Sequence, residues 1–374
     1  MRQAVLAAIA RVRPAGALSD PMLSISAAPR TFGRAMATGS DVEISQALPW
    51  WGTLDARRQA ARAEADAQRH DLAALRLHLA ALARGAFADW VFVERALQIN
   101  GANRSVIATV RRIATVRYAS GRAPQADVLQ ADVARALLKR QQLRWQRQLT
   151  VVRARMNALL DRAPDTAIPA PATLPEPSPL PAEAMLLRRA LSQPRLEALA
   201  AEARAAGARE RLARKHRYPE IRVSAGYNSM WPDPAMRPMV GLSFTLPLDQ
   251  GKYRAEIDAA HARVLQASAR LQGRRAALLA DVSASYASTR EAAQSLALYR
   301  DDLVPLARDA LAVALSEYGS GQGSFLGVLI AEEHQLDTEL GLARAQSDYF
   351  QRLATLEQLS GGGWRASVTY GGGR

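Results

Sequence analysis

Two pairs of short segments alternate apolar with polar residues along the chain. A period of two is typical of β-strands with one apolar face. Between the members of each pair, Pro29–Asp41 and Asn228–Pro238 are rich in turn-favouring residues. The pattern predicts two β-hairpins, over residues 21–49 and 218–248, whose second faces carry Ser, Thr, Gly and Gln. The apolar positions are Leu23, Ile25, Ala27, Val42 and Ile44 in the first hairpin, and Ile221, Val223, Ala225, Tyr227, Val240, Leu242, Phe244 and Leu246 in the second.

After each hairpin the apolar period becomes helical. Thr53–Arg117 and Lys252–Glu317 contain no proline except Pro305. Each is about 65 residues long and would extend roughly 95–100 Å as a helix. Return helices are expected at about 124–160 and 324–359, which predicts two helical hairpins, over 50–163 and 249–360. Heptad-like spacing indicates coiled-coil packing, at Leu72, Leu75, Leu79, Leu82 and Ala86, at Val264, Leu271 and Leu278, and at Leu329, Leu336, Ala343 and Phe350.

The two halves of the chain repeat each other at an offset of about 200 residues. Segments beginning at Asp20 and Val42 match later segments at an offset of 198, and the segment beginning at Tyr118 matches at 200. Gly52 corresponds to Gly251, one residue out of step. Several matches in the same order indicate a duplicated structure. The predicted fold is therefore mostly α with a small β part, comprising long coiled-coil hairpins and four strands.

The remaining segments complete this organisation. A Pro-rich linker is expected at 164–180, leading helices of the second copy at 181–217, and a flexible tail at 361–374. Residues 1–20 correspond to the end of the same leading helix in the first copy. Subtracting the offset of 198 from 181 places the start of that helix about 17 residues before Met1. We therefore expect an N-terminally short form from which the signal peptide is missing.

Composition limits the alternatives. The net charge of +14 raises the possibility of nucleic-acid binding, but 35 acidic residues are interleaved with the basic ones, which favours solvated helix faces. Only three of the 49 basic residues are Lys, and this Arg and Ala bias fits either close helix packing or genome composition. With no Cys and no apolar run of 18 residues, disulfides and spanning helices are excluded. A soluble Arg-rich coiled-coil scaffold and a nucleic-acid-binding protein remain as alternatives.

No arrangement of residues typical of catalysis is found. His70 and His78, eight positions apart on a predicted helix, are too far apart to share an ion. Met230, Met236 and Met239 cluster in a hairpin loop, where such a group is more often incidental than metal-binding. We therefore predict no enzyme, no cofactor and no metal site.

The strands require association of several copies. Four amphipathic strands cannot close a barrel alone, and open edges are not tolerated in lipid. Three chains would give twelve strands, an even number within the range of outer-membrane barrels. The apolar faces would then contact lipid, and Trp50 and Trp51 would lie at the membrane interface. Prolines at all four strand ends predict a barrel–tube junction, at Pro21, Pro49, Pro219 and Pro247.

Nearly the whole chain resembles the TolC-like outer-membrane efflux family. The resemblance rests on ISQALPWWG at 44–52, YPEI at 218–221, and YASG followed by DVLQA at 118–131. The first of these is most similar to the heavy-metal branch. The resemblance implies a homotrimeric, twelve-stranded barrel in the bacterial outer membrane, continued by a periplasmic helical tube. It also implies a periplasmic adaptor and an inner-membrane transporter of the resistance-nodulation-division type as partners, with metal ions or small toxic compounds as cargo.

The resemblance also assigns a role to the two helical turns, which would contact the adaptor and open like an iris. Family members often carry carboxylates near this entrance. Asp127 fits one such position, but its counterpart is Gly327, so either a pore role or a favourable first-turn charge is open for Asp127. The residues assigned to the tips are Tyr118, Ser120, Gly121, Asp127, Val128 and Leu129 in the first copy, and Tyr318, Ser320, Gly321, Val328 and Leu329 in the second.

Overall fold

The computed structural model describes residues 1–28, 39–171, 173–231 and 233–363. The chain divides into two compact units. We call Met1–Ala74 with Ser192–Ala277 the strand unit, and Leu75–Leu191 with Leu278–Arg374 the hairpin unit. The expected tail at 361–374 falls outside the described residues except for its first three positions.

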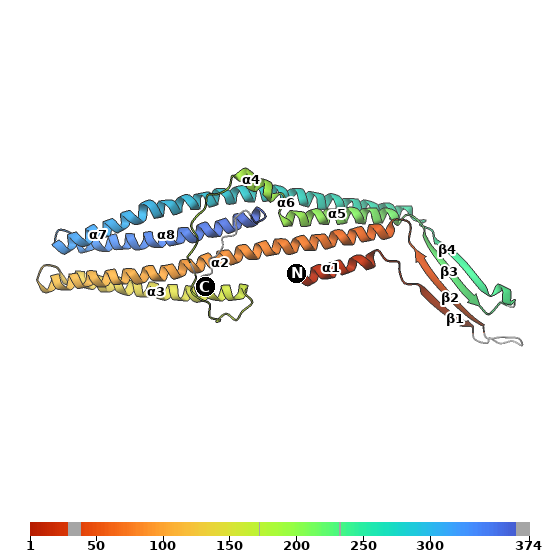
Figure 1. Ribbon diagram of the computed structural model, residues 1–374, viewed down its shortest axis with the longest axis horizontal. Coiled ribbons are helices and arrows are strands. Elements are labelled where there is room, and N and C mark those ends of the chain that lie inside the picture. The colour runs from red at the N-terminus through yellow and green to blue at the C-terminus, as the bar shows by residue number, and fades with distance from the viewer. Residues whose placement is uncertain (29–38, 172, 232, 364–374) are drawn as a thin grey trace, which may run out of the picture. The chain divides into compact units, whose positions relative to one another are not determined.

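The strand unit holds one antiparallel sheet in the order β1-β2-β3-β4 (Figure 1). Its strands are β1 (Met22–Ala28), β2 (Gly39–Leu48), β3 (Glu220–Asn228) and β4 (Pro238–Thr245). Pairing of β2 with β3 joins the two predicted hairpins into a single sheet. The first loop was predicted too long, because β2 already begins at Gly39. The rest of that loop, residues 29–38, lies outside the described residues.

The pairing register places the apolar side chains on one face of the sheet. Leu23 is opposite Ile44, Val42 opposite Tyr227, and Val223 opposite Leu242. Directly opposed residues in a sheet share a face, so the apolar positions of all four strands form one continuous surface. That surface is open to solvent in the single chain, with Ile25 exposed by 71% and Val240 by 86%.

The opposite face is polar. It carries Ser24 and Ser26 on β1, Ser224 on β3 and Ser243 on β4, and Arg222 points its guanidinium towards Ser45 at 3.5 Å. The assignment of Gln to this face was wrong. Gln46 is in register with Val223, on the apolar face, because it lies an even number of positions from Val42 and Ile44. Its amide donates to the carbonyls of Ser19 and Ala47, which satisfies the side chain at the strand end.

Helices complete the strand unit. They are α1 (Arg2–Ala15), α5 (Pro194–Lys215), and the first parts of α2 (Thr53–Ala119) and α6 (Gln250–Leu298). Their buried positions are mostly Ala, which lets helix backbones approach closely. Ion pairs tie α5 to α2 beside this seam, between Arg195 and Asp71 and between Arg209 and Glu64. The buried alanines include Ala56, Ala60, Ala63, Ala67, Ala198, Ala201 and Ala205.

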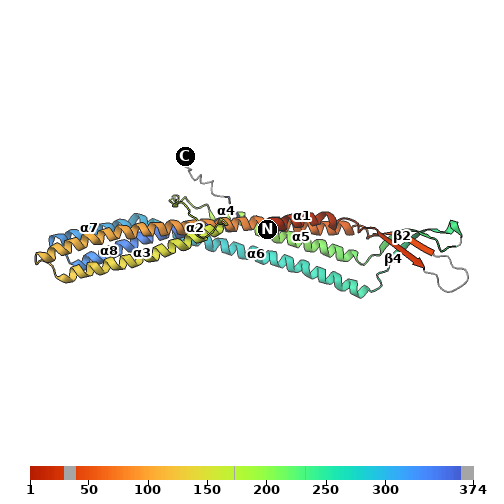
Figure 2. The ribbon, with the colours of Figure 1, turned by 90° about the horizontal axis from the view of Figure 1, so that it is seen from below.

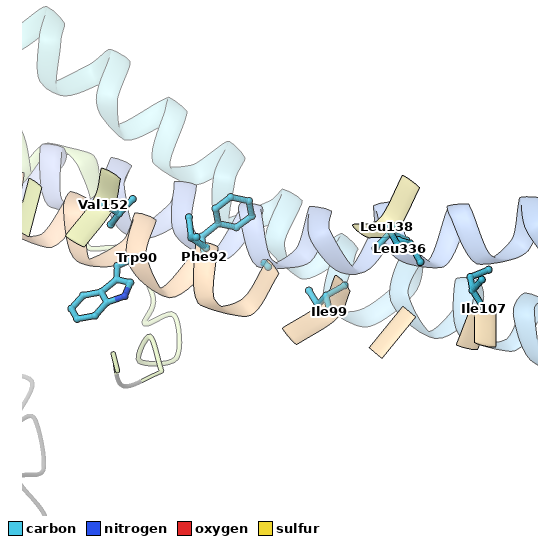
Figure 3. Close-up of a cluster of buried hydrophobic side chains, with 9 residues drawn as sticks. Trp90, Phe92, Ile99, Ile107, Leu138, Val152 and Leu336 are labelled. Carbon is cyan, nitrogen blue, oxygen red and sulfur yellow. The ribbon is translucent and has the colours of Figure 1, made fainter. Parts of the chain in front are cut away.

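The hairpin unit contains two antiparallel helical pairs, in which α3 returns beside α2 and α8 returns beside α7 (Figures 1 and 2). It comprises α3 (Gln125–Leu159), the short α4 (Glu183–Ala190), α7 (Val304–Ser320), α8 (Phe325–Leu359) and the remainders of α2 and α6. Figure 3 shows how three of these helices share one core, with Trp90, Phe92, Ile99 and Ile107 from α2, Leu138 and Val152 from α3, and Leu336 from α8.

The helical segment expected to run from Lys252 to Glu317 is not one α-helix. A π-helical turn, η2 (Tyr299–Leu303), separates α6 from α7. Pro305 begins α7 at its first turn and has no N–H to donate, and its ring would crowd the carbonyl of Asp301 in a regular α-helix. The wider turn accommodates both effects. Among the described residues, no helix combines the length and apolar content needed to span a membrane.

Candidate functional site

Both helical hairpins reverse at a glycine in the left-handed conformation. Gly121 has a φ of 70° and Gly321 a φ of 90°, a region that favours glycine because it has no Cβ. Each preceding serine closes the last helical turn in the same way. Ser120 Oγ donates to the Arg117 carbonyl and Ser320 Oγ to the Glu317 carbonyl, both at 3.0 Å. The duplication therefore extends to the hydrogen bonds of the two turns.

A side-chain hydrogen bond connects the two tips within the hairpin unit. Tyr318, at the end of α7, is 2% exposed and donates its hydroxyl to Asp127 Oδ2, in the first turn of α3, at 2.8 Å. Burial, with Asp127 as acceptor, raises the pKa of Tyr318 to about 12. Arg117 lies over the same ring, 4.6 Å from its centroid, and donates to the Tyr318 carbonyl. Tyr318 thus contacts the first hairpin through its ring, its hydroxyl and its backbone.

The two tips differ in what they expose. Tyr118 is 47% exposed, whereas its counterpart Tyr318 is buried. Val328 is fully buried in a tip core with Val110, Leu311 and Phe325, while Val128 packs at its edge. Leu129 is exposed and Leu329 half-buried. Beside them lie further exposed apolar side chains, at Val116, Leu326 and Ile330. The tips therefore present an apolar surface over a well-packed interior.

Asp127 and its counterpart serve different local roles. Asp127 lies in the first turn of α3, where a carboxylate interacts favourably with the helix dipole, and it also accepts the bond from Tyr318. Gly327, at the equivalent place in α8, donates its backbone N–H to Ser324 Oγ at 3.0 Å, so Ser324 caps that helix. Asp127 in the first copy thus links the two tips, whereas Ser324 in the second copy caps α8.

Sequence reasoning noted Glu332 and Glu333 one turn after Gly327 as carboxylates near the tip, but it did not predict that Glu332 is buried in α8. Glu332 is 6% exposed, and its Oε1 has no hydrogen-bond partner among the described residues. Burial, reinforced by the nearby carboxylates of Glu333 and Asp337, raises the pKa of Glu332 to about 7. The signal was present in the sequence, because Glu332 lies between Leu329 and Leu336 at the three–four spacing of the coiled-coil seam.

The predicted junction prolines lie beside the strands of the strand unit. Pro21, Pro49 and Pro219 directly flank β1, β2 and β3, and Pro247 follows β4 by two residues. Next to Pro49, Trp50 stacks on Tyr218 with ring centroids 4.9 Å apart and planes 6° from parallel. Trp51 meets Trp50 edge-on and is 73% exposed.

Two basic side chains that sequence reasoning missed surround the same tyrosine. The Arg217 guanidinium lies 5.1 Å and the Lys215 ammonium 5.8 Å from the Tyr218 ring centroid. Arg217 also donates to the Tyr218 hydroxyl at 3.1 Å. This hydrogen bond from Arg217, with the two positive charges, holds the pKa of Tyr218 below its usual value. Among the described residues, no group of His, Cys, Asp and Glu side chains could hold a metal ion.

Solved structures define the class of fold. VceC, an outer membrane protein of Vibrio cholerae, is similar with a TM-score of 0.79 at 23% identity, over 96% of this chain and 92% of that one. CusC gives 0.83 at 19% identity, over 97% and 88%. The open-state outer membrane channel MtrE of Neisseria gonorrhoeae gives 0.79 at 19% identity, over 97% and 86%. The prediction of a TolC-like fold, mostly helical with four antiparallel strands, is confirmed.

The sequence itself matches one family. Residues 186–362, most of the second copy, match the family of outer membrane efflux proteins. No curated protein sequence matches the chain. The chain therefore has the fold of outer-membrane efflux channels and carries the sequence pattern of that family in its second half. None of these matches singles out the heavy-metal branch.

Proposed function

We propose that this chain is the outer-membrane channel subunit of a tripartite efflux pump and acts as a passive exit duct. Three copies would form a twelve-stranded barrel, and their helices a periplasmic tube. The observation that carries the proposal is the sheet, which has one continuous apolar face open to solvent and one polar face. An exposed apolar surface of this kind indicates an interaction site, and lipid on one side with a wet lumen on the other accounts for both faces.

The sheet edges support closure by further copies. Within the described residues, β1 and β4 each pair on one side only. Because the four strands alternate in direction, β4 of one copy would meet β1 of the next in an antiparallel joint. Such a ring has no unpaired edge, as lipid requires. A soluble scaffold would leave both the edges and the apolar face without a partner.

The helical tips suit docking of the periplasmic adaptor that connects the duct to an inner-membrane transporter of the resistance-nodulation-division type. Exposed apolar side chains surround both turns, including Tyr118, Leu129 and Leu326. The Tyr318–Asp127 bond holds the second hairpin against the first. An iris-like opening of the tips would have to break this bond, so it is a candidate restraint on the closed entrance.

The proposed cargo is metal ions or small toxic compounds. Support for metal ions comes from the run ISQALPWWG at 44–52, with its resemblance to the heavy-metal branch. A passive duct would leave selection of the cargo mainly to the transporter. The channel can therefore serve either class of compound without a dedicated binding site.

A matched pair of substitutions on β1 tests the proposed orientation of the sheet. Ile25→Arg puts a charge on the apolar face, and Ser26→Arg puts the same charge on the polar face, opposite Asp41. Arg facing lipid near the bilayer midplane costs about 2–4 kcal/mol. We expect Ile25→Arg to reduce the heat-modifiable oligomer in the outer-membrane fraction strongly, and Ser26→Arg to leave it nearly unchanged. Equal yields, or a soluble wild-type protein, would refute the proposal.

A further inference from the structure

The aromatic and basic side chains beside Pro49 form one cluster, composed of Trp50, Trp51, Lys215, Arg217 and Tyr218. Tyr218 is its centre, because Trp50 stacks on its ring and both cations approach the same ring. Gly52, in the left-handed conformation, lies beside Lys215, where an added Cβ would be in ordinary van der Waals contact, 3.6 Å from Lys215 Cε. The cluster is therefore held together by the fold.

The two cations are available to an external anion. Neighbouring charges on the same segment are engaged, since Arg214 pairs with Glu210 and His216 lies 3.7 Å from Glu256. Lys215 and Arg217 have no carboxylate within ion-pair distance in the described part of the chain; their contacts there are to Tyr218. Two unneutralised cations on an aromatic platform match a phosphate group, which accepts hydrogen bonds from both.

The position of the cluster specifies the source of the phosphate. It lies where the apolar face of the sheet ends, with Trp50 two residues after Leu48 and Tyr218 three residues before Ile221, the last pair of β2 and β3. Trp51 and, after β4, Leu248 are widely exposed at this end. Exposed Trp beside Lys or Arg is typical of the boundary between acyl chains and headgroups. We propose that the cluster binds the phosphate of an anionic glycerophospholipid in the leaflet that faces the periplasm, a proposal that rests on the proposed outer-membrane function.

The cluster is a composite of both sequence copies. Trp50 and Trp51 come from the first copy, and Lys215, Arg217 and Tyr218 precede the first strand of the second. At the offset of 198, Trp50 and Trp51 correspond to Leu248 and Asp249, and Lys215 and Arg217 to Ala17 and Ser19. The reciprocal combination therefore lacks both the indoles and the cations. We expect one lipid site per chain.

Native mass spectrometry of the detergent-purified protein, titrated with phosphatidylglycerol, tests this site. Each basic side chain near an anionic lipid surface contributes about fivefold to binding. We expect one retained phosphatidylglycerol per chain, and about 30-fold weaker binding for Lys215→Gln/Arg217→Gln. The control Arg263→Gln/Arg270→Gln removes the same charge from exposed positions on α6. Arg263 lies seven residues, about 10 Å, further along α6 than Glu256, which contacts His216. This is beyond the roughly 8 Å Debye length, so binding should change less than twofold.

Three outcomes would overturn the assignment. They are equal weakening by the two double variants, equal retention of phosphatidylethanolamine and phosphatidylglycerol, or preferential retention of lipid A, whose phosphates lie in the other leaflet. Trp51→Ala removes an indole but no charge, so it measures the aromatic contribution to binding. It should also weaken the retention of phosphatidylglycerol. The oligomer mass is read from the same spectra, so a protein that fails to form trimers contradicts the proposed channel, independently of whether it retains the lipid.

Discussion

Glu332 places a carboxylate in the apolar seam of a coiled coil. A charged group in such a position is destabilising unless it is paired, and here its Oε1 is without a partner among the described residues. Burial therefore raises the pKa of Glu332 to about 7. At neutral pH the residue is therefore divided between its neutral and ionised forms, and small changes of environment alter its charge.

This raised pKa predicts a pH dependence of stability. A carboxyl whose pKa is higher in the folded protein stabilises the fold fully below its unfolded pKa of 4.5, and that contribution is lost as pH rises through about 7. The loss corresponds to roughly 3 kcal/mol. We expect Glu332→Gln to protect the tip amides in hydrogen exchange at pH 8 relative to wild type, and to differ little at pH 4.5.

Glu333 supplies the control for this experiment. It is the next residue on α8 and is exposed, so Glu333→Gln removes the same charge from the surface of the helix. It should change the pH dependence only slightly, by removing a neighbour of Glu332. If the two variants behave alike, the effect belongs to net charge and not to burial.

At the residue scale, some features could be predicted from the sequence and others could not. Gly121 and Gly321 were predictable, because a tight reversal between two helices favours glycine. Glu332 was detectable as a charged residue at a seam position. The contacts of Arg217 and Lys215 with Tyr218 were not, since nothing in the sequence tells two exposed basic residues from the many other arginines of the chain. Only the fold brings Trp50 to Tyr218, 168 positions later.

At the scale of elements, the Tyr318–Asp127 bond joins the two helical hairpins, a contact that the internal repeat did not predict. A hydrogen bond to a charged acceptor contributes about 1.5–3 kcal/mol. We expect Tyr318→Phe to loosen the tips, raising amide exchange around Gly121 and Gly321 and increasing single-channel conductance in planar bilayers. Asp127→Asn should act in the same direction and less strongly, because an amide oxygen still accepts.

The duplicated chain offers a matched control for this bond. Tyr118→Phe removes the equivalent hydroxyl, which is exposed and makes no hydrogen bond in the described structure. It should leave both exchange and conductance unchanged. An effect of Tyr118→Phe as large as that of Tyr318→Phe would show that the tips respond to general loss of polarity, not to this contact.

Element types and faces followed from periodicity, whereas departures from regularity did not. The four strands were predicted correctly because every second residue in them is apolar. The pairing register places these apolar residues opposite one another across all four strands. Gln46 was misplaced because its polarity was weighed above its even spacing from Ile44. The π-turn before Pro305 was missed because a proline near the end of a long segment predicts a disturbance but not its form.

At the scale of the whole molecule, assembly of several copies would explain two features of the single chain, its unpaired sheet edges and its uncovered apolar sheet face. Edge strands β1 and β4 lack a second neighbour among the described residues, and the apolar sheet face lacks a cover. A closed ring in lipid would provide both the missing strand neighbours and the missing cover. The number of strands in the sequence leads to the same expectation, since four strands are too few to close a barrel.

The cysteine-free sequence makes disulfide trapping a direct test of this claim. Ser24→Cys or Ser26→Cys on β1 is combined with Ser243→Cys or Thr245→Cys on β4, so that several registers are sampled on the polar face. Disulfides need Cα atoms within about 7 Å. Ser24→Cys with Ser224→Cys is the control, because β1 and β3 are two strands apart, roughly 9–10 Å.

We expect at least one edge pair to yield disulfide-linked trimers on denaturing, non-reducing gels of outer membranes, while each single variant and the β1–β3 pair stay uncross-linked as monomers. Edge-pair disulfides that form only within one chain, or edge pairs that remain monomeric in outer membranes at every register sampled, would contradict closure of the sheet by neighbouring copies.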